Sequence, residues 1–449
     1  MSSASLRGYV DMSTLYIANI RSDYAESVRA ATGLAEHSLP GGDTAARFLW
    51  HLESGDVLVT PDNPKAGFQE YMERYTGVSP DALHVVCTGG LIDDATLLSE
   101  LVVAQVRNIV VNPMEWTLEA FVLTPGVVGL AAILGMSPPA GHEFASEGGV
   151  ALINLKSSFR ALAAGIGVPI PMGVTVRSAD DLLSSILQLR EHSDALIVKH
   201  QRGGGGRGNI GLSRSATGLS GTRATVRMPD DPAELATALW NDLTEDGNTQ
   251  VTVECYVEGG RPFYVEWYVD EARAKLVSTG EIRYSESVAS EEASPVWLGL
   301  GLPGSFSAYA SNRIVMESFR FIEHLRTIGY RGYANIDGLI TDSGVLYFHE
   351  INARWGGGLV VAAIAEKFLG PTWSDAWCAS MILDVPRLQL GVVIDLLDQA
   401  GLAYSRGGEG VLILGVDSDL GAGCELMIIA RNREGVARLE AKLREVFLH

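Results

Sequence analysis

Two acidic residues on a short predicted hairpin carry the strongest chemical signal in the chain. Two alternating strands flank Asp342-Ser343-Gly344, and a two-residue Ser-Gly turn would pair Asp337 with Glu350 and Asn335 with Asn352. Opposed carboxylates repel unless a cation lies between them, and Mg²⁺ prefers such oxygens together with water and substrate phosphates. The hairpin therefore predicts a magnesium site, while a solvated hairpin with an incidental acidic pair remains the alternative.

A glycine-dense loop, residues 202–208, follows an apolar strand that ends at Lys199. Glycines let backbone N–H groups approach phosphate oxygens closely, because no Cβ obstructs them; the candidates are Gly204, Gly205 and Gly206. The loop lacks the ending of a Walker A motif and the spacing of a dinucleotide-binding turn, so a mobile hairpin tip is the alternative. Lys199 and the upstream Lys156 are expected to point at polyphosphate, although each alone also fits a surface lysine.

Further segments carry candidate substrate contacts. The strand at 251–257 can offer backbone groups to an adenine edge with Tyr256 or Val257 near the base, although a plain core strand fits equally well. Arg283 is a candidate to neutralise a substrate carboxylate, with a surface ion pair as the alternative. Residues 285–307, which carry acids and an aromatic residue, predict a substrate-covering loop or an insertion.

These residues need a large scaffold. A chain of 449 residues predicts three packed domains. Residues 1–141 alternate short apolar runs, such as 57–59 and 109–111, with helical patterns such as 95–106, which indicates an α/β unit. Residues 142–385 form a predicted α+β region that contains the loop and the hairpin.

Residues 386–449 predict a small α/β C-terminal piece. It contains two apolar strands, 411–416 and 425–430, and an amphipathic helix at 434–447. The apolar stripe of that helix comprises Val436, Leu439, Leu443 and Val446. This stripe is expected to pack against the central region or against a second subunit.

Charge and composition limit the partners. A net charge of −20 repels phosphate backbones, so neither nucleic acid nor an anionic membrane is an expected partner. Residues 120–141 lack ionisable groups, but prolines and glycines interrupt the segment, which indicates buried core and not a membrane span. The first twenty residues do not resemble a secretory signal, and four widely spaced cysteines predict reduced thiols, so we expect a cytoplasmic protein.

The linear order of these elements resembles the ATP-grasp superfamily of carboxylate-amine ligases over roughly residues 142–370. The matching residues are Lys156, Lys199, the glycine loop, Glu254-x-Tyr256-Val257, Asp337 and Glu350-x-Asn352-x-Arg354. The resemblance implies two α+β subdomains that clasp ATP, preceded by a pre-ATP-grasp α/β domain. The layout of the whole chain also resembles the peptide ligases of pheganomycin-type antibiotic biosynthesis.

The resemblance implies a role for each residue. Lys156 and Lys199 would hold the phosphates, Glu254 would accept from the adenine amino group, and the backbone at Tyr256 and Val257 would contact the ring. Magnesium, expected as two ions, would be bound by Asp337, Glu350 and Asn352. Arg354 would approach the transferred phosphoryl group or the acyl phosphate. Arg261 stands where many relatives place an acid for the ribose, so the ribose contact is left open.

The implied enzyme is an ATP-dependent peptide ligase. It would activate a carboxylic acid, for example a guanidino-bearing phenylglycine-type acid, as an acyl phosphate and join it to the N-terminal amine of a peptide, releasing ADP and phosphate. Its partners would be a small carboxylic acid, a peptide or amino-acid amine, and a second copy in a homodimer. The alternatives are an amino-acid or dipeptide ligase, a carboxylase relative, and a non-catalytic ATP-binding regulator.

Overall fold

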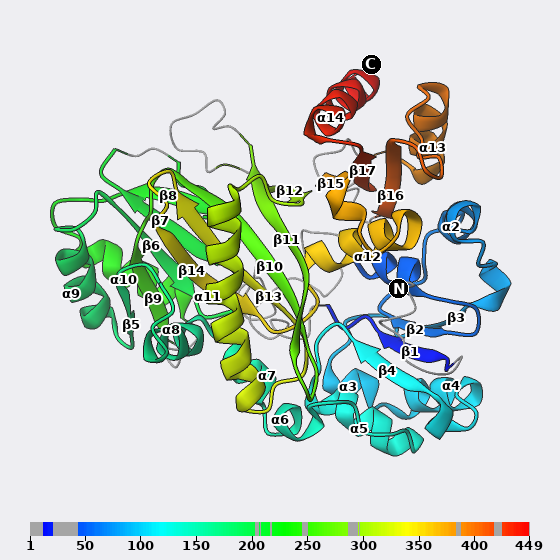
Figure 1. Cartoon of the computed structure of the whole chain (residues 1–449). Helices are drawn as coiled ribbons and strands as arrows, with labels where there is room; N and C mark the ends of the chain where they lie inside the picture. The colour runs from blue at the N-terminus through cyan, green and yellow to red at the C-terminus, as the bar shows by residue number, and fades with distance from the viewer. Residues whose placement is uncertain are drawn as a thin grey trace.

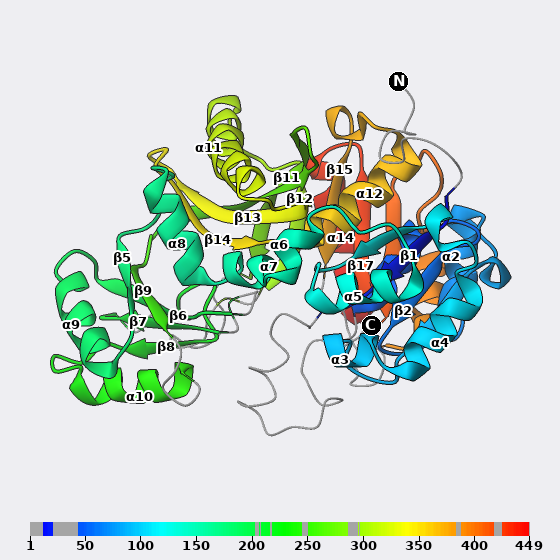
Figure 2. The same ribbon diagram turned by 90° about the horizontal axis from the view of Figure 1, so that it is seen from below.

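Three β-sheets organise the protein, as a computed structural model shows (Figure 1). The structure describes residues 12–20, 44–202, 206, 208–215, 218–244, 250–285, 295, 297–382, 388–416 and 424–448. Along the chain a four-stranded sheet comes first, a five-stranded sheet second and an eight-stranded sheet last. The five-stranded sheet stands at the opposite side of the molecule from the four-stranded one, with the eight-stranded sheet between them (Figures 1 and 2).

The N-terminal sheet is parallel throughout, with strand order β3-β2-β1-β4. Its strands are β1 (Thr14–Ile17), β2 (Val57–Thr60), β3 (His84–Cys87) and β4 (Thr117–Ala120). Its helices are η2 (Thr44–His51), α2 (Phe68–Thr76), η3 (Pro80–Ala82), α3 (Asp94–Leu97), α4 (Glu100–Ile109), η4 (Pro113–Glu115) and α5 (Pro125–Leu134). Parallel strands joined by helices confirm the predicted α/β unit.

Two local predictions in this sheet are wrong. The helix expected at 95–106 breaks at Ser99, whose side chain accepts a hydrogen bond from Val102 N–H and so begins α4. The run at 109–111 is not a strand, because Ile109 ends α4 and Asn112 then takes a left-handed conformation with φ of 54° before Pro113. The strand that pairs with β1 on the side opposite β2 comes later, at β4.

The five-stranded sheet has the order β5-β9-β6-β7-β8. Its strands are β5 (Gly173–Val176), β6 (Ala195–His200), β7 (Asn209–Ser213), β8 (Ala224–Arg227) and β9 (Val251–Cys255). Helices α9 (Ala179–Leu189) and α10 (Ala233–Leu243) bury one face, with Leu196 and Val198 of β6 in that core. Because side chains alternate along a strand, Lys199 is presented on the opposite face.

The eight-stranded sheet is antiparallel, with the order β14-β13-β10-β11-β12-β15-β17-β16. Its strands are β10 (Gly260–Val269), β11 (Ala274–Tyr284), β12 (Trp297–Leu302), β13 (Gly332–Thr341), β14 (Leu346–Asn352), β15 (Cys378–Ile382), β16 (Gly410–Val416) and β17 (Cys424–Ala430). Helix α11 (Ala308–Thr327) crosses one face (Figure 1), and α12 (Gly357–Leu369) joins the core shared with the N-terminal sheet.

The predicted C-terminal strands and helix form at β16, β17 and α14 (Arg433–Leu448), with α13 (Leu390–Gln399) before them. They continue the central sheet, because β17 pairs with β15. Leu439 and Leu443 are buried in the same core, so the stripe of α14 packs against the chain's own sheet. The domain boundaries at 141 and 385 stay a prediction.

Short elements connect the parts: α6 (His142–Ser146), α7 (Gly149–Ile153), α8 (Lys156–Gly165) and η5 (Trp373–Asp375). The apolar segment at 120–141 contributes the end of β4 and the helix α5, whose Val127 and Leu130 are buried. Among the described residues, no helix is long and apolar enough to cross a membrane.

Candidate active site

The hairpin of β13 and β14 brings the predicted acids together. Asp337 lies opposite Glu350 and Asn335 lies opposite Asn352, so the predicted pairing is confirmed. The predicted two-residue turn is wrong, however, because Thr341 N–H donates to the Val345 carbonyl across a three-residue loop.

A bulge reconciles the longer loop with the predicted pairing. Near the turn Gly338 pairs with Phe348, whereas one step farther Asp337 pairs with Glu350, so His349 is an extra residue on β14. The bulge cancels the one-residue shift that the longer loop introduces. It thereby keeps both carboxylates on one face of the sheet.

The two carboxylates have opposite protonation tendencies. Burial and the neighbouring Glu350 raise the pKa of Asp337 well above its ordinary value. Burial also opposes ionisation of Glu350, but Lys156 and other cations outweigh it and lower the Glu350 pKa to about 2. Asp337 accepts a hydrogen bond from Asn352 Nδ2 at 3.2 Å on Oδ2, while its Oδ1 has no hydrogen-bond partner among the described residues.

Both predicted lysines are buried, each with 4% of its surface exposed. Lys156 Nζ lies 3.2 Å from Glu350 Oε2, and Lys199 Nζ lies 2.7 Å from Glu254 Oε2. The surface-lysine alternative is therefore wrong for both. Gln201 holds the two segments together, because its carbonyl accepts from Lys156 N–H and its Oε1 accepts from the N–H of residue 157.

Glu254 is enclosed by cations. Its Oε1 accepts from Arg160 Nη1 at 2.6 Å, and its Oε2 contacts Lys199. Burial opposes ionisation, but Lys199 and Arg160 outweigh it and lower the pKa of Glu254. Since both oxygens have partners and the residue is 1% exposed, an adenine amino group would have to share one of these oxygens.

The predicted adenine segment lies at the end of β9. Tyr256 N–H donates to the Ala195 carbonyl, and the Tyr256 hydroxyl accepts from Ser220 N–H at 3.1 Å. The Tyr256 N–H is thus committed to β6, and Val257 follows it half-buried at the surface.

The glycine loop connects β6 to β7. Gly206 has φ of 75°, and a Cβ there would lie 2.6 Å from the Gly221 carbonyl oxygen, so only glycine allows this close approach. Gly204 and Gly205 lie outside the described residues. Gly206 therefore lies against the turn at Gly221, whose neighbour Ser220 contacts Tyr256.

Arg354 follows β14 directly and lies beside the predicted metal-binding residues of the hairpin. Its Nη1 donates to Asn352 Oδ1 at 2.5 Å, and its guanidinium lies over the Phe121 ring, 5.6 Å from the centroid. Its charge favours ionisation of Asp337 against burial. The structure thus brings Arg354 together with the predicted metal-binding residues.

The turn after Arg354 is held by a buried acid that the sequence analysis missed. Gly356 N–H donates to Glu266 Oε1 at 2.9 Å, whereas Glu266 Oε2 has no partner among the described residues. Burial raises the pKa of Glu266 to about 8, although the Gly356 hydrogen bond and Arg354 act in the opposite direction. Glu266 pairs across the sheet with Asn335, whose Oδ1 also lacks a described partner.

The sequence analysis also missed two residues that lie near the carboxylates. His349, the bulge residue, faces the cluster, and burial together with Lys199 lowers its pKa to about 4. Burial is the main cause that raises the pKa of Tyr284, and the negative charges of Asp337 and Glu350 raise it further. Tyr284 is the next residue after Arg283 and faces the other side of β11, which alternation could have indicated.

Arg283 is not brought to the site, so its prediction as a substrate-binding residue is corrected. Its two terminal nitrogens bind the Glu440 carboxylate on α14, with Nη2 2.8 Å from Oε2, and it also contacts Ser380. Along β11, alternation places Arg283 on the face opposite Tyr284. The alternative of an ion pair is correct, but the pair is partly buried and does not lie at the surface as predicted.

The substrate-covering loop expected at 285–307 is wrong in part. Residues 297–302 form β12, which pairs with β11 and β15. Residues 286–294 and 296 lie outside the described part of the chain.

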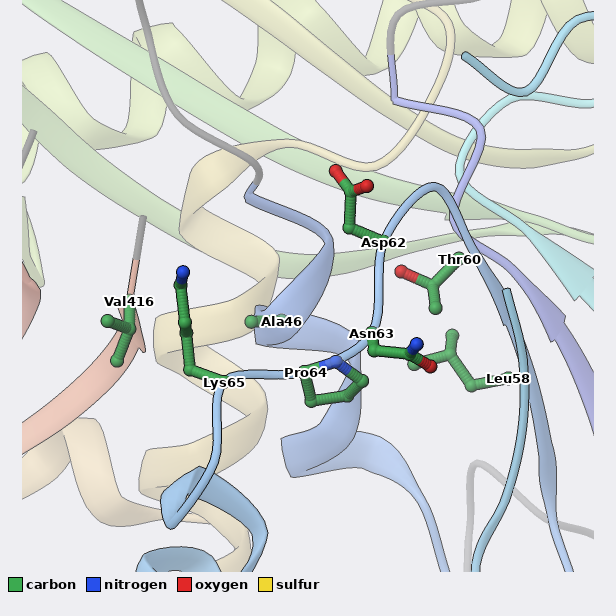
Figure 3. Close-up of a pocket in the computed structure, with 8 residues that line it drawn as sticks. All are labelled: Ala46, Leu58, Thr60, Asp62, Asn63, Pro64, Lys65 and Val416. Carbon is green, nitrogen blue, oxygen red and sulfur yellow. The ribbon is translucent and has the colours of Figure 1, made fainter. Parts of the chain in front are cut away.

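A small hollow lies elsewhere, where the carboxyl end of β2 meets the end of β16 (Figure 3). Its lining includes Thr60, Asp62, Lys65 and Val416. A volume of about 10 Å³ accommodates roughly one water molecule, so the hollow does not hold an organic substrate.

The chain is similar to known proteins in the sequence of one domain and in its overall fold. Residues 45–136 match the family model described as Pre ATP-grasp domain. A sequence search of curated proteins found no match. The chain is similar to N5-carboxyaminoimidazole ribonucleotide synthetase from Thermus thermophilus, with a TM-score of 0.58, 13% identity, and coverage of 97% of this chain and 99% of that chain.

Two nucleotide complexes show the same likeness. N5-Carboxyaminoimidazole synthetase from Staphylococcus aureus complexed with ADP has a TM-score of 0.57 at 10% identity over 98% of each chain. The biotin carboxylase complex with β-γ-ATP from Campylobacter jejuni has a TM-score of 0.57 at 12% identity, covering 97% of this chain and 91% of that chain. The chain thus has a pre-ATP-grasp domain and an ATP-grasp fold of mixed α/β and α+β architecture, as the resemblance implied.

Proposed function

We propose that the protein is an ATP-dependent ligase that activates a carboxylic acid and joins it to an amine. One observation carries the proposal: the opposed carboxylates Asp337 and Glu350 lie near two buried lysines. Lys156 of α8 contacts Glu350, whereas Lys199 of β6 contacts Glu254 and acts on Glu350 through its charge. Two buried cations beside two buried acids suit a polyphosphate with its metal, since each charge then has an opposite charge to bind.

The proposed nucleotide site lies between the five-stranded sheet and the eight-stranded sheet. Lys156 and Lys199 hold the phosphates, with Gly204, Gly205 and Gly206 supplying backbone N–H groups. Glu254 and the backbone at Tyr256 and Val257 lie at the adenine end. Nucleotide complexes are known for structures of this fold, including those with ADP and with β-γ-ATP.

The residues of the hairpin fit magnesium. Two carboxylate oxygens and an amide oxygen are hard ligands, and Asp337 Oδ1 is buried without a described partner beside a second carboxylate that disfavours its ionisation. Asp337, Glu350 and Asn352 would hold the metal, proposed as two ions. When bound, the metal neutralises the charge of the transferred phosphoryl group.

The chemistry requires activation, because a carboxylate is a resonance-stabilised anion with a poor leaving group. A carboxylate oxygen attacks the γ-phosphorus, the bond to ADP breaks, and an acyl phosphate forms. The amine nitrogen then attacks the acyl carbon, phosphate leaves, and the nitrogen loses a proton. Arg354, which donates to Asn352, would stabilise the negative oxygens that develop in both steps.

The finer proposal concerns the substrates. The acid is a guanidino-bearing phenylglycine-type acid and the amine is the N-terminus of a peptide, as the resemblance to pheganomycin-type ligases suggests. The net charge of −20 suits a cationic acid better than an anionic one. We further propose a cytoplasmic homodimer, which cell fractionation and light scattering test.

The decisive assay measures phosphate release from MgATP with acids and peptides, added singly and together, followed by mass spectrometry. The proposal expects release that needs both substrates and a product lighter than their sum by one water. The Asp337→Asn variant is the matched control and should abolish release. Nucleotide binding without substrate-dependent release would instead indicate a regulator.

A bicarbonate-dependent carboxylase is the second candidate. It is favoured by the mutual coverage of 97% and 99% with an N5-carboxyaminoimidazole ribonucleotide synthetase, which extends through all three sheets. ADP formation that depends on bicarbonate, and not on an added organic acid, would support it over peptide ligation.

A further inference from the structure

Glu254 is bound by two cations that differ in how firmly they are held. Lys199 reaches it from β6 through a single ammonium group, 2.7 Å from Oε2. Arg160 reaches the other oxygen from α8 at 2.6 Å. The Glu254 side chain is almost fully enclosed, so its charge depends on these partners and not on water.

Arg160 is anchored independently of Glu254. Its Nη1 also donates to the Pro171 carbonyl at 3.2 Å, and its Nη2 donates to the Gly173 carbonyl at 2.8 Å. A guanidinium held by two backbone carbonyls in addition to Glu254 has little freedom to leave. Lys199, by contrast, has a flexible four-carbon stem that can redirect its ammonium group.

Recruitment of Lys199 by a phosphate would remove one of these two charges. A buried carboxylate that loses its only cation incurs a large desolvation penalty, which would oppose the recruitment. With Arg160 in place, Glu254 retains a charged partner after Lys199 turns away. The second cation therefore lowers the cost of releasing the first.

We propose that Arg160 is a positioning residue of the nucleotide site, which holds Glu254 as its ion-pair partner so that Lys199 can turn from Glu254 to a nucleotide phosphate. The inference rests on the proposed ATP binding. Arg160 does not touch the nucleotide in this arrangement. It sets the availability of the lysine that does.

The position of Arg160 on α8 supports the proposal. Lys156 and Arg160 are one helical turn apart, so they share a face of the helix. Lys156 contacts Glu350 of the eight-stranded sheet, whereas Arg160 contacts Glu254 of the five-stranded sheet. One helix thus supplies a cation to the acid of each half of the site.

The test compares Arg160→Gln, which removes the charge but keeps a polar side chain, with Arg160→Lys, which keeps the charge. Calorimetry measures the Kd of a non-hydrolysable ATP analogue with Mg²⁺, and circular dichroism verifies folding. We expect Arg160→Gln to raise the Kd by about tenfold or more and Arg160→Lys to stay within about threefold of the native protein.

Removal of the acid distinguishes positioning from damage to the structure. In the double variant Arg160→Gln/Glu254→Gln no buried carboxylate holds Lys199, so its Kd should return to within about threefold of that of Glu254→Gln alone. Additive weakening in the double variant, or native affinity in Arg160→Gln, would overturn the inference. If Arg160→Gln does not fold, the double variant set against Glu254→Gln still decides, because no carboxylate then needs Arg160.

The outcomes also separate this inference from the function on which it rests. Absence of analogue binding by the native protein would refute the proposed function itself. Binding by the native protein with no effect of Arg160→Gln would refute only the role of Arg160.

Discussion

Replacement of Glu266 by glutamine should make the protein more stable at alkaline pH. Glu266 has no exposed surface, and burial raises its pKa from an ordinary value of 4.5 to about 8. Because the folded state then binds a proton that the unfolded state releases, native stability falls as the pH rises from about 4.5 to about 8. Above pH 8 the fall levels off, because Glu266 then ionises in the folded state as well and the two states no longer differ in bound protons.

The size of the effect follows from the same values. The two states differ in pKa by about 3.5 pH units, and each unit corresponds to 1.36 kcal/mol, so the loss has a ceiling of about 5 kcal/mol. Glutamine stays neutral at every pH and retains an Oε1 acceptor for Gly356 N–H. Its amide group also supplies a donor on the side of Asn335, whose Oδ1 lacks a described partner.

The assay is urea denaturation of the native protein and Glu266→Gln at several values between pH 5.5 and 9. Unfolding is followed by tryptophan fluorescence, to which the buried Trp355 next to Gly356 contributes with the other tryptophans of the chain. We compare midpoint concentrations, because a protein of several domains need not unfold in two states. The variant should gain stability over the native protein steadily up to about pH 8 and then hold the gain.

Glu281→Gln is the matched control, since it removes one negative charge from the opposite face of the same sheet, where Glu281 contacts Arg433 and Arg261. It should show no such gain at alkaline pH. A constant difference between Glu266→Gln and the native protein at pH 6 and pH 9 would refute the reasoning. Glu266 would then carry its charge throughout and be compensated by a partner in the native state.

Three further outcomes are expected. Asp337→Asn removes the repulsion with Glu350, so it should raise thermal stability without Mg²⁺ by about 1 kcal/mol or more while abolishing Mg²⁺-dependent stabilisation in the same melts. Lys156→Met leaves the acids without their nearest cation and should cost about 3–5 kcal/mol by urea denaturation, a loss that added Mg²⁺ partly restores. Arg283→Met should cost about 1–3 kcal/mol by unpairing Glu440 while leaving the KM of both organic substrates unchanged; a raised KM would restore its substrate role.

The hairpin could be predicted from the sequence because its signals are local. Period-two alternation and a turn sequence place Asp337 opposite Glu350 without knowledge of the rest of the fold. The turn itself was misjudged by one residue, and the bulge at His349 corrected the pairing. No sequence pattern marks that bulge, since His349 is an ordinary member of an alternating strand.

The contacts that the sequence did not reveal join distant parts of the chain. Arg160 meets Glu254 across 94 positions, and Arg283 meets Glu440 across 157 positions. Periodicity identifies which face of an element is apolar, but it does not identify which charged side chains two elements bring together. The sequence likewise indicated two C-terminal strands without showing that β17 extends the central sheet through β15.

The segment that begins α8 explains how distant residues form one site. Asn154 accepts from Ala353 N–H at 2.7 Å, one residue before Arg354, and Lys156 contacts Glu350 on the same hairpin. Gln201 holds the start of the helix to the end of β6, and Arg160 binds Glu254 of β9. A displacement of the five-stranded sheet is therefore transmitted through α8 to Glu350 of the eight-stranded sheet. Helix α8 thus links the five-stranded sheet to the hairpin of β13 and β14. Neither the sheet nor the hairpin could move relative to α8 without breaking a buried ion pair.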